Sequence, residues 1–265
     1  MKLKLIQADT RPLKLYLESR KLDYGPPDQM NFGLIASLNK NILIQPNDPN
    51  SIARMLNLIK SKFFGFEYEF VLGNPLDWQE NGLKAHTWIK IHALMSQIKD
   101  TKNSHIDLFC FIDSDAWIRD ERAFVEFCQD FMNREEHIAL PRDIEVNNAS
   151  FLNSGFIAVK NTEHGFHILD TIYNHPDYRD KELSSWHEQS QLSKYNERHP
   201  GEIYILPLND FNTPCGRIVR HCWIKHLVEP FVIEEAIALL TRLGVSFSSE
   251  PHLSIGSNIQ VTPPS

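Results

Sequence analysis

The 265-residue sequence predicts an α/β fold, in which helices flank a central sheet, and two patterns carry this prediction. Short, almost unbroken apolar runs at residues 3–6 and 106–112 are typical of strands that are buried on both faces. Between them, residues 87–98 have apolar positions that recur every three or four residues, as in a helix with one buried face. Strands that alternate with such helices form α/β domains.

The N-terminal elements follow in order. The strand expected at residues 3–6 stops at a polar loop, and an apolar segment at 41–45 leads into the turn-rich residues 47–51. That turn can cap a helix over residues 52–59, and residues 68–72 are expected to form the next strand. Substrates of α/β proteins usually bind where such strands end.

The rest of the chain continues the alternation. The run 106–112 ends abruptly at Asp113-Ser114-Asp115, which places two acids at the carboxyl end of a central strand. The later elements comprise a helix at 123–132, short strands at 138–140 and 155–159, and helices at 166–173 and 229–243. The last of these helices is expected to pack in the core or at a subunit contact.

One domain, residues 1–244, accounts for all these elements, and the Ser- and Pro-rich residues 245–265 are expected to form a loosely held tail. The composition is 42% hydrophobic and 23% charged, and the net charge of −7 argues against a nucleic-acid-binding surface. No stretch approaches the roughly 20 apolar residues that span a bilayer, so we expect no transmembrane segment and a cytoplasmic protein.

The four cysteines are scattered and form no CxxC pair. This favours reduced thiols over a disulfide framework or a zinc site. They are Cys110, Cys128, Cys215 and Cys222.

Asp113 and Asp115 are the strongest candidates for metal ligands. In an extended segment, residues two apart point to the same side, so both carboxylates can bind one divalent cation while Ser114 faces away from it. Such a cation neutralises diphosphate oxygens and stabilises a departing nucleotide. The alternative is that Asp-Ser-Asp is only a helix cap or a turn.

Five segments, in order between residues 84 and 226, resemble those of GT-A glycosyltransferases that carry a DxD motif. The resemblance is strongest to the retaining family that contains fungal α-galactosyl- and α-mannosyltransferases and plant xylosyltransferases. The first segment is WIKIHALMSQI and the second is the DxD strand DLFCFIDSDAWI. The other three are FLNSGFIAVKN, WHEQSQL and NDFNTPCGRIVRHCWIKH.

This resemblance implies a GT-A fold, with a Rossmann-like mixed sheet flanked by helices. It implies transfer of a sugar from a nucleoside-diphosphate-sugar, such as a UDP- or GDP-sugar, to a carbohydrate hydroxyl, with retention of anomeric configuration. It also implies Mn²⁺ or Mg²⁺ as the cofactor, held by Asp113, Asp115 and His221.

Other site residues follow from the same resemblance. Glu188 and Gln189 would lie under the anomeric carbon of the donor and take part in catalysis, although a solvated helix start has a similar sequence. Asn153 and Gly155 would lie beside the donor sugar, where glycine admits a close approach, although a bend before a strand explains them equally.

The remaining donor-binding candidates surround this centre. Residues at the end of the first strand would bind the nucleotide, and basic residues would contact its phosphates. The alternative is that these side chains are only solvated surface residues. These candidates are Asp9, Thr10, Arg11, Lys90, Ser114, Lys225 and His226.

Two other functions remain open at this point. A nucleotidyltransferase that makes nucleotide-sugars also combines an α/β fold with Mg²⁺-bound carboxylates, but the sequence lacks its glycine-rich, lysine-bearing phosphate loop near the N-terminus. A carbohydrate-binding protein that kept the fold and lost turnover is the second alternative, and the Asp-Ser-Asp motif together with the downstream histidine argues against it.

Overall fold

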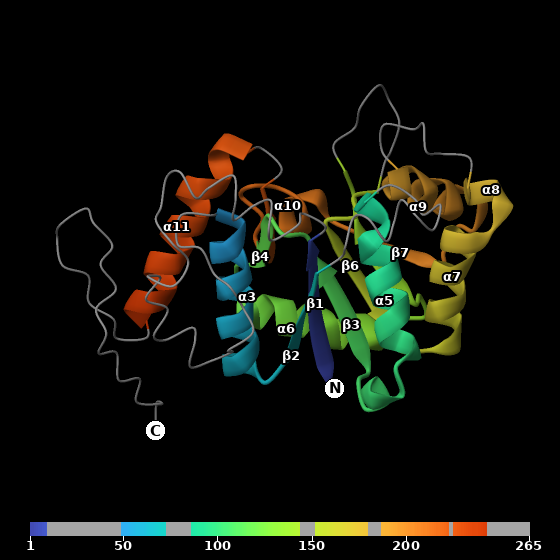
Figure 1. The fold of residues 1–265 in the computed structure, drawn as a ribbon, viewed down its shortest axis with the longest axis horizontal. Helices are drawn as coiled ribbons and strands as arrows, with labels where there is room; N and C mark the ends of the chain where they lie inside the picture. The colour runs from blue at the N-terminus through green and yellow to red at the C-terminus, as the bar shows by residue number, and fades with distance from the viewer. Residues whose placement is uncertain (10–48, 73–85, 144–151, 180–186, 223–224, 243–265) are drawn as a thin grey trace.

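A computed structural model describes residues 1–9, 49–72, 86–143, 152–179, 187–222 and 225–242 (Figure 1). Its main feature is a six-stranded mixed sheet with the strand order β2-β1-β3-β6-β5-β7. The strands are β1 (Leu3–Asp9), β2 (Glu67–Leu72), β3 (Leu108–Ile112), β5 (Ile138–Pro141), β6 (Phe156–Lys160) and β7 (Ile203–Leu206). Neighbouring strands run parallel, except that β6 runs antiparallel to both β3 and β5.

A second, two-stranded sheet lies beyond the end of β3. It pairs β4 (Ala116–Ile118) with β8 (Val219–His221) in antiparallel register, so that Ala116 lies opposite His221. Strands of three residues carry too few positions for a recognisable period, so neither of them is predictable from the sequence.

Helices cover the main sheet on both faces (Figure 1). The α-helices are α3 (Pro49–Phe64), α5 (Ile89–Lys99), α6 (Glu121–Met132), α7 (Glu163–Asn174), α8 (Pro176–Arg179), α9 (His187–Arg198), α10 (Leu208–Phe211) and α11 (Lys225–Arg242). Two 3₁₀ turns, His86–Trp88 and Thr101–Asn103, flank α5. Within the described residues from β1 to α7, the predicted α/β order of strands and helices is therefore confirmed.

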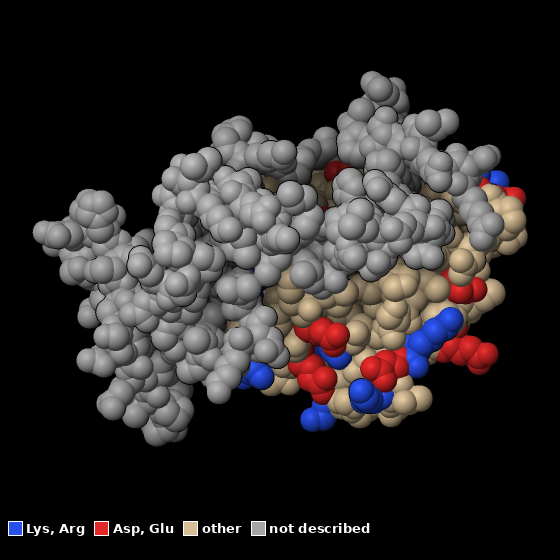
Figure 2. All heavy atoms as spheres, viewed as in Figure 1, with Lys and Arg blue, Asp and Glu red and all other residues tan. Residues whose placement is uncertain are grey.

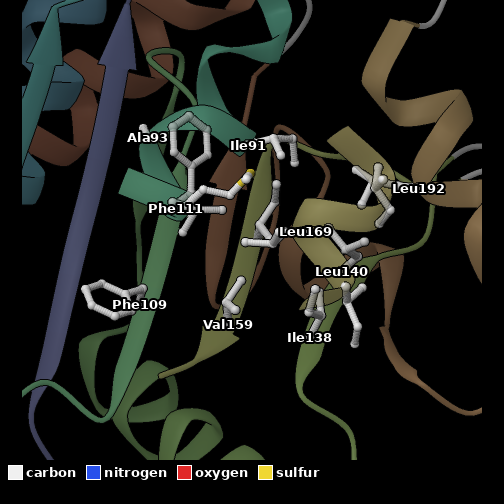
Figure 3. Close-up of a cluster of buried hydrophobic side chains, with 14 of the residues drawn as sticks. Ile91, Ala93, Phe109, Phe111, Ile138, Leu140, Val159, Leu169 and Leu192 are labelled. Atoms are coloured by element: carbon white, nitrogen blue, oxygen red, sulfur yellow. The ribbon is translucent and has the colours of Figure 1, made fainter. Parts of the chain in front are cut away.

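The central strand β3 is buried along its whole length because both its faces are covered. Phe109 and Phe111 face a core that α5, α7 and α9 close, together with Val159 of β6 (Figure 3). The alternate β3 side chains, among them Cys110, contribute to a second core against α6. Each fully buried Phe side chain stabilises the fold by about 1.5–3 kcal/mol, so β3 is held firmly on both sides.

Local sequence signals set the starts of two helices. The Asp120 carboxylate accepts a hydrogen bond from the Ala123 N–H at 2.9 Å and caps α6. The Thr162 hydroxyl accepts one from the Gly165 N–H at 3.1 Å and caps α7. A glutamate in the first turn of each helix complements the helix dipole.

A third core joins α3, β4 and α11. Val232, Ala236 and Leu239 of α11 are buried against α3, together with Trp117 of β4, so the predicted apolar face of this helix packs within the chain. The helix begins at Lys225, one turn before the predicted start at residue 229. Two predicted segments, residues 41–45 and the tail at 245–265, lie outside the described residues.

Lys60 of α3 is buried within this layer, with 1% of its surface exposed. Its ammonium lies 3.1 Å from the Glu121 carboxylate and 3.0 Å from that of Glu235. It also donates hydrogen bonds to the backbone carbonyls of Ile118, at 2.6 Å, and Arg119, at 3.3 Å. One cation thus joins α3, α6 and α11 to the end of β4.

The described part of the surface carries charged side chains of both signs (Figure 2). Acidic and basic side chains are interspersed on the described part of the face shown in Figure 2. In the part of the chain that the structure describes, no helix is both long and apolar enough to cross a bilayer. All four cysteines are free thiols, and only Cys215 is exposed.

Replacement of Lys60 by Met is expected to lower the free energy of unfolding by about 3–5 kcal/mol, since it leaves the mostly buried Glu235 carboxylate without this cation and Glu121 with only its contact to Arg242. Urea denaturation followed by circular dichroism measures the change. Lys62→Met, on the exposed side of the same helix, is the matched control and should change stability by less than about 0.5 kcal/mol. Equal stability of the two variants would contradict the prediction.

Candidate functional site

Polar residues gather at one edge of the main sheet. The carboxyl ends of β1, β3 and β5 and the start of the antiparallel β6 meet there, as the register of Ile112 opposite Phe156 requires. Asp113 directly follows β3, and its N–H donates a hydrogen bond to the Gly155 carbonyl at 2.8 Å, just before β6. The strand ends therefore bring two distant parts of the sequence into contact.

Asp113 and Asp115 converge through a turn. The carbonyl of Asp113 accepts a hydrogen bond from the Ala116 N–H at 3.0 Å, which folds the chain back into β4. The extended geometry expected from the sequence is therefore wrong for this segment, because the strand ends at Ile112 and the paired acids occupy a tight turn. The two carboxylates still face a common point.

His221 of β8 completes a three-residue cluster with these acids. One ligand atom from each residue lies within 4.8 Å of the others. The His221 Nε2 atom is 3.4 Å from an oxygen of Asp115 and 3.7 Å from one of Asp113. Two carboxylates and an imidazole suit a divalent cation such as Mn²⁺, so the residues present fit the metal that the sequence implied.

Hydrogen bonds fix the histidine in the form that a metal needs. The Asn212 amide nitrogen donates to the Arg142 carbonyl and to the Asp143 carboxylate, both at 3.2 Å, and both of these groups only accept. The Asn212 carbonyl oxygen therefore faces His221 Nδ1, 2.7 Å away. Nδ1 must then carry a hydrogen, which leaves Nε2 of the neutral ring to face the acids.

Gly155 provides the space for this ring. A Cβ atom at Gly155 would lie only 2.1 Å from the His221 Cε1 atom and 2.3 Å from Nδ1. The close approach that the sequence suggested at this glycine is thus made by a side chain of the protein itself. Contact of Gly155 with a donor sugar stays a prediction.

Lys90 of α5 links the acids to a second part of the site. Its ammonium is 2.9 Å from one oxygen of Asp113, and it lies 3.3 Å from the Glu188 carboxylate. Ser154 connects the same groups, since its hydroxyl donates to Glu188 at 2.8 Å and accepts from Lys90 at 3.2 Å. Lys90 and Glu188 are both buried, with 7% and 4% of their surfaces exposed.

The pKa values reflect this crowding. Burial acts to lower the pKa of Lys90, but Asp113 and Glu188 outweigh it and raise the pKa above its ordinary value. Burial raises the pKa of Asp113, against the charges of Lys90 and His221. Burial opposes ionisation of Asp115 and His221 too, yet their mutual hydrogen bond and attraction lower the pKa of Asp115 and raise that of His221.

Asp143 connects Gln189 to the metal cluster. The Asp143 carboxylate accepts hydrogen bonds from the amide nitrogens of three side chains. They are Gln189 at 2.6 Å, Asn153 at 3.2 Å and Asn212 at 3.2 Å. The Asn153 carbonyl oxygen accepts a hydrogen bond from the Gly155 N–H at 2.7 Å. The same side chain therefore links the bend before β6 to Asp143. Three side-chain amides that converge on one carboxylate fix its position.

The structure brings together most of the described residues that the sequence predicted for the site, and it adds three that the sequence did not predict. Glu188 and Gln189 begin α9, as the helix-start alternative required, but they are buried, not solvated. The missed residues are Asp143, Ser154 and Asn212. A single acid two residues after a short strand was the only signal that pointed to Asp143.

Several predicted donor contacts have no described side chain. Asp9 ends β1 and lies at the edge of the sheet where the cluster lies, and Lys225 and His226 begin α11, but the placement of these three side chains is not described. Thr10 and Arg11 lie outside the described residues. Ser114 is half-buried between the two acids.

Comparison with solved structures identifies the fold. A glycosyltransferase involved in the glycosylation of the major capsid of PBCV-1 aligns with a TM-score of 0.57 over 88% of this chain and 100% of that protein, at 10% identity. The chain therefore has the predicted GT-A fold, and identity this low restricts the conclusion to the fold. No family model and no curated protein sequence matches the chain.

Two further solved structures align with lower scores. The glycosyltransferase GlyE of Streptococcus pneumoniae TIGR4 gives a TM-score of 0.46 at 11% identity, over 92% of this chain and 63% of that protein. Mouse xyloside xylosyltransferase 1 gives 0.44 at 11% identity, over 85% of this chain and 99% of that protein. Scores at this level add no argument of their own.

Replacement of Gly155 by Ala is expected to lower the melting temperature by several degrees, because the new methyl group collides with the His221 ring. Removal of the ring should relieve the collision, so the double variant Gly155→Ala/His221→Ala should melt above Gly155→Ala alone. Differential scanning calorimetry of both single variants and the double variant measures the coupling. Strictly additive losses would contradict the steric explanation.

Proposed function

We propose that this protein is a metal-dependent glycosyltransferase that moves a sugar from a nucleoside-diphosphate-sugar to a carbohydrate hydroxyl, with retention of anomeric configuration. The observation that carries the proposal is the cluster of Asp113, Asp115 and His221 at the end of the central strand, within 4.8 Å of one another in a GT-A fold. Lys90 and Glu188 lie next to this cluster, where they can contact the phosphates and the sugar of the donor.

The charge at this edge supports a divalent cation. Asp113, Asp115 and Glu188 place three carboxylates together, and among the described residues Lys90 is the lysine or arginine paired with them. With His221 neutral, two negative charges stay uncompensated in a partly buried setting, which is costly without a cation. A divalent cation held by Asp113, Asp115 and His221 would restore neutrality and supply positive charge for the diphosphate of the donor.

The protein's own residues have separable tasks in this proposal. When bound, the cation would neutralise the diphosphate and stabilise the departing nucleotide. Lys90 holds Glu188 and Asp113 in a fixed relation and adds positive charge where the leaving group develops negative charge. Glu188 and Gln189 support the positive charge that develops on the sugar on the face opposite the nucleotide, and Gln189 is oriented by Asp143.

The two alternative functions make different predictions for one experiment. Incubation with a panel of nucleotide-sugars, Mn²⁺ and simple sugar acceptors, followed by mass spectrometry, detects transfer or donor hydrolysis. A parallel incubation with nucleoside triphosphates and sugar phosphates tests for a nucleotidyltransferase, which would form a nucleotide-sugar and release diphosphate. Binding without turnover would favour a carbohydrate-binding protein. NMR of any product reads its anomeric configuration, and inversion would contradict the tasks assigned to Glu188 and Gln189.

Asp113→Asn and Asp115→Asn are each expected to lower kcat/KM roughly a hundredfold or more, because each change removes a cation ligand and its charge. Turnover is measured with the donor that the panel identifies, at saturating Mn²⁺. Asp130→Asn, the same chemical change at an exposed position of α6, is the control and should keep full activity. Turnover near the wild-type level in both site variants would refute the metal assignment.

Binding of Mn²⁺ is expected to weaken as the pH falls from 8 to 6. Asp115 raises the pKa of His221 in the metal-free protein, so a proton competes for Nε2 below that raised pKa, and the dissociation constant should rise by up to about tenfold per pH unit. Titration calorimetry of Mn²⁺ at several pH values measures this slope. His221→Ala should weaken binding and flatten the slope, whereas the neighbouring change His226→Ala should do neither. A larger effect at His226 would reverse the assignment.

A further inference from the structure

The backbone of β4 is hydrogen-bonded on both edges, although the structure describes a strand neighbour on only one. Its partner β8 pairs with one edge. At the other edge, buried side chains bond to the backbone polar groups that a further strand would otherwise satisfy. Because β4 begins directly after the Asp-Ser-Asp turn, these side chains also hold the turn that carries two of the three metal ligands.

Asn57 of α3 provides one of these contacts. It has no exposed surface, and its amide nitrogen donates to the Ala116 carbonyl at 3.0 Å. Its carbonyl oxygen accepts from the Ile118 N–H, also at 3.0 Å. One side chain thus makes the two bonds that a neighbouring strand would make, and the opposed donor and acceptor groups fix which way its amide points.

Gln7 of β1 provides the second contact. It is likewise fully buried, and its amide nitrogen donates to the Asp113 carbonyl at 3.0 Å and to the Ala116 carbonyl at 3.4 Å. The Tyr68 hydroxyl donates to its carbonyl oxygen at 2.8 Å. Burial raises the pKa of this hydroxyl, against the opposing charge of Arg54, so it stays protonated as a donor.

We infer that Gln7 and Asn57 are positioning residues for the metal centre, an amide pair that sets the geometry of the Asp113–Ala116 turn and so the affinity for the cation. This inference rests on the proposed function. The pair bonds to the carbonyl of Asp113 and to that of Ala116, and the Cys222 N–H donates to the intervening Asp115 carbonyl at 3.0 Å from the other side.

The turn is therefore restrained at three of its four carbonyls, which leaves little freedom to the two carboxylates. Metal centres require their ligands within about 0.5 Å of the binding geometry, and groups that orient the ligands typically change metal affinity 10–100-fold when they are removed. Both amides bond to backbone groups of the turn and of β4 and make no hydrogen bond to the Asp113 or Asp115 carboxylates, so their contribution acts through the backbone.

The test compares Mn²⁺ binding with stability in the full-length chain. Asn57→Leu and Gln7→Met keep the approximate side-chain volume and remove the hydrogen bonds to the turn. Ile59→Ala is the control, because it removes buried apolar volume from the same helix and its side chain makes no hydrogen bond to β4. The dissociation constant is obtained from the electron paramagnetic resonance signal of free Mn²⁺, and the melting temperature from thermal denaturation.

We expect each amide variant to raise the Mn²⁺ dissociation constant roughly tenfold or more, whereas Ile59→Ala should lower the melting temperature and leave the constant within about twofold of wild type. Wild-type affinity in the amide variants, or an equal loss in Ile59→Ala, overturns the inference while the metal site stands. If the wild type binds Mn²⁺ no better than Asp113→Asn, the metal centre itself is refuted and the positioning role with it. Gln7→Met decides the question if Asn57→Leu does not fold.

Discussion

The concentration of negative charge at the carboxyl end of β3 is the constraint on which the site depends. Buried carboxylates repel one another and lose their hydration, so they persist only where counter-charge and hydrogen bonds hold them. Lys90 supplies that charge between Asp113 and Glu188, and this requirement explains why a lysine is buried on α5. The packing of α5 against the sheet therefore also places the Lys90 ammonium between the carboxylates of the site.

The direction of a single strand is equally important. Because β6 runs antiparallel to β3, the residues before β6 lie beside those after β3, and Gly155 bonds to Asp113 across the gap. Because Gly155 has no Cβ, the His221 ring fits beside it, and the pairing of β8 with β4 places His221 there. The small second sheet thus determines which histidine reaches the acids.

The sequence predicted the parts of this arrangement that depend on local patterns. An apolar run that ends in Asp-Ser-Asp located β3 and two candidate metal ligands, and helical spacing located α5 with Lys90. The turn at Asp113 was only the alternative to an extended segment, because a two-residue spacing is compatible with either geometry. Asp143 and Asn212 were missed because their roles come from contacts between segments far apart in the chain. Gln7 was placed in the polar loop after the first strand, whereas it lies within β1, and nothing in the helical pattern of residues 52–59 singled out Asn57.

The order of the ligands along the chain has a consequence for biosynthesis. Lys90 leaves the ribosome before Asp113 does, so a counter-ion is already present when the acids emerge and the nascent sheet can close around them. His221 follows the acids by roughly 5–20 s at usual rates of translation. The proposed metal centre is therefore complete only after all six strands of the main sheet have been synthesised.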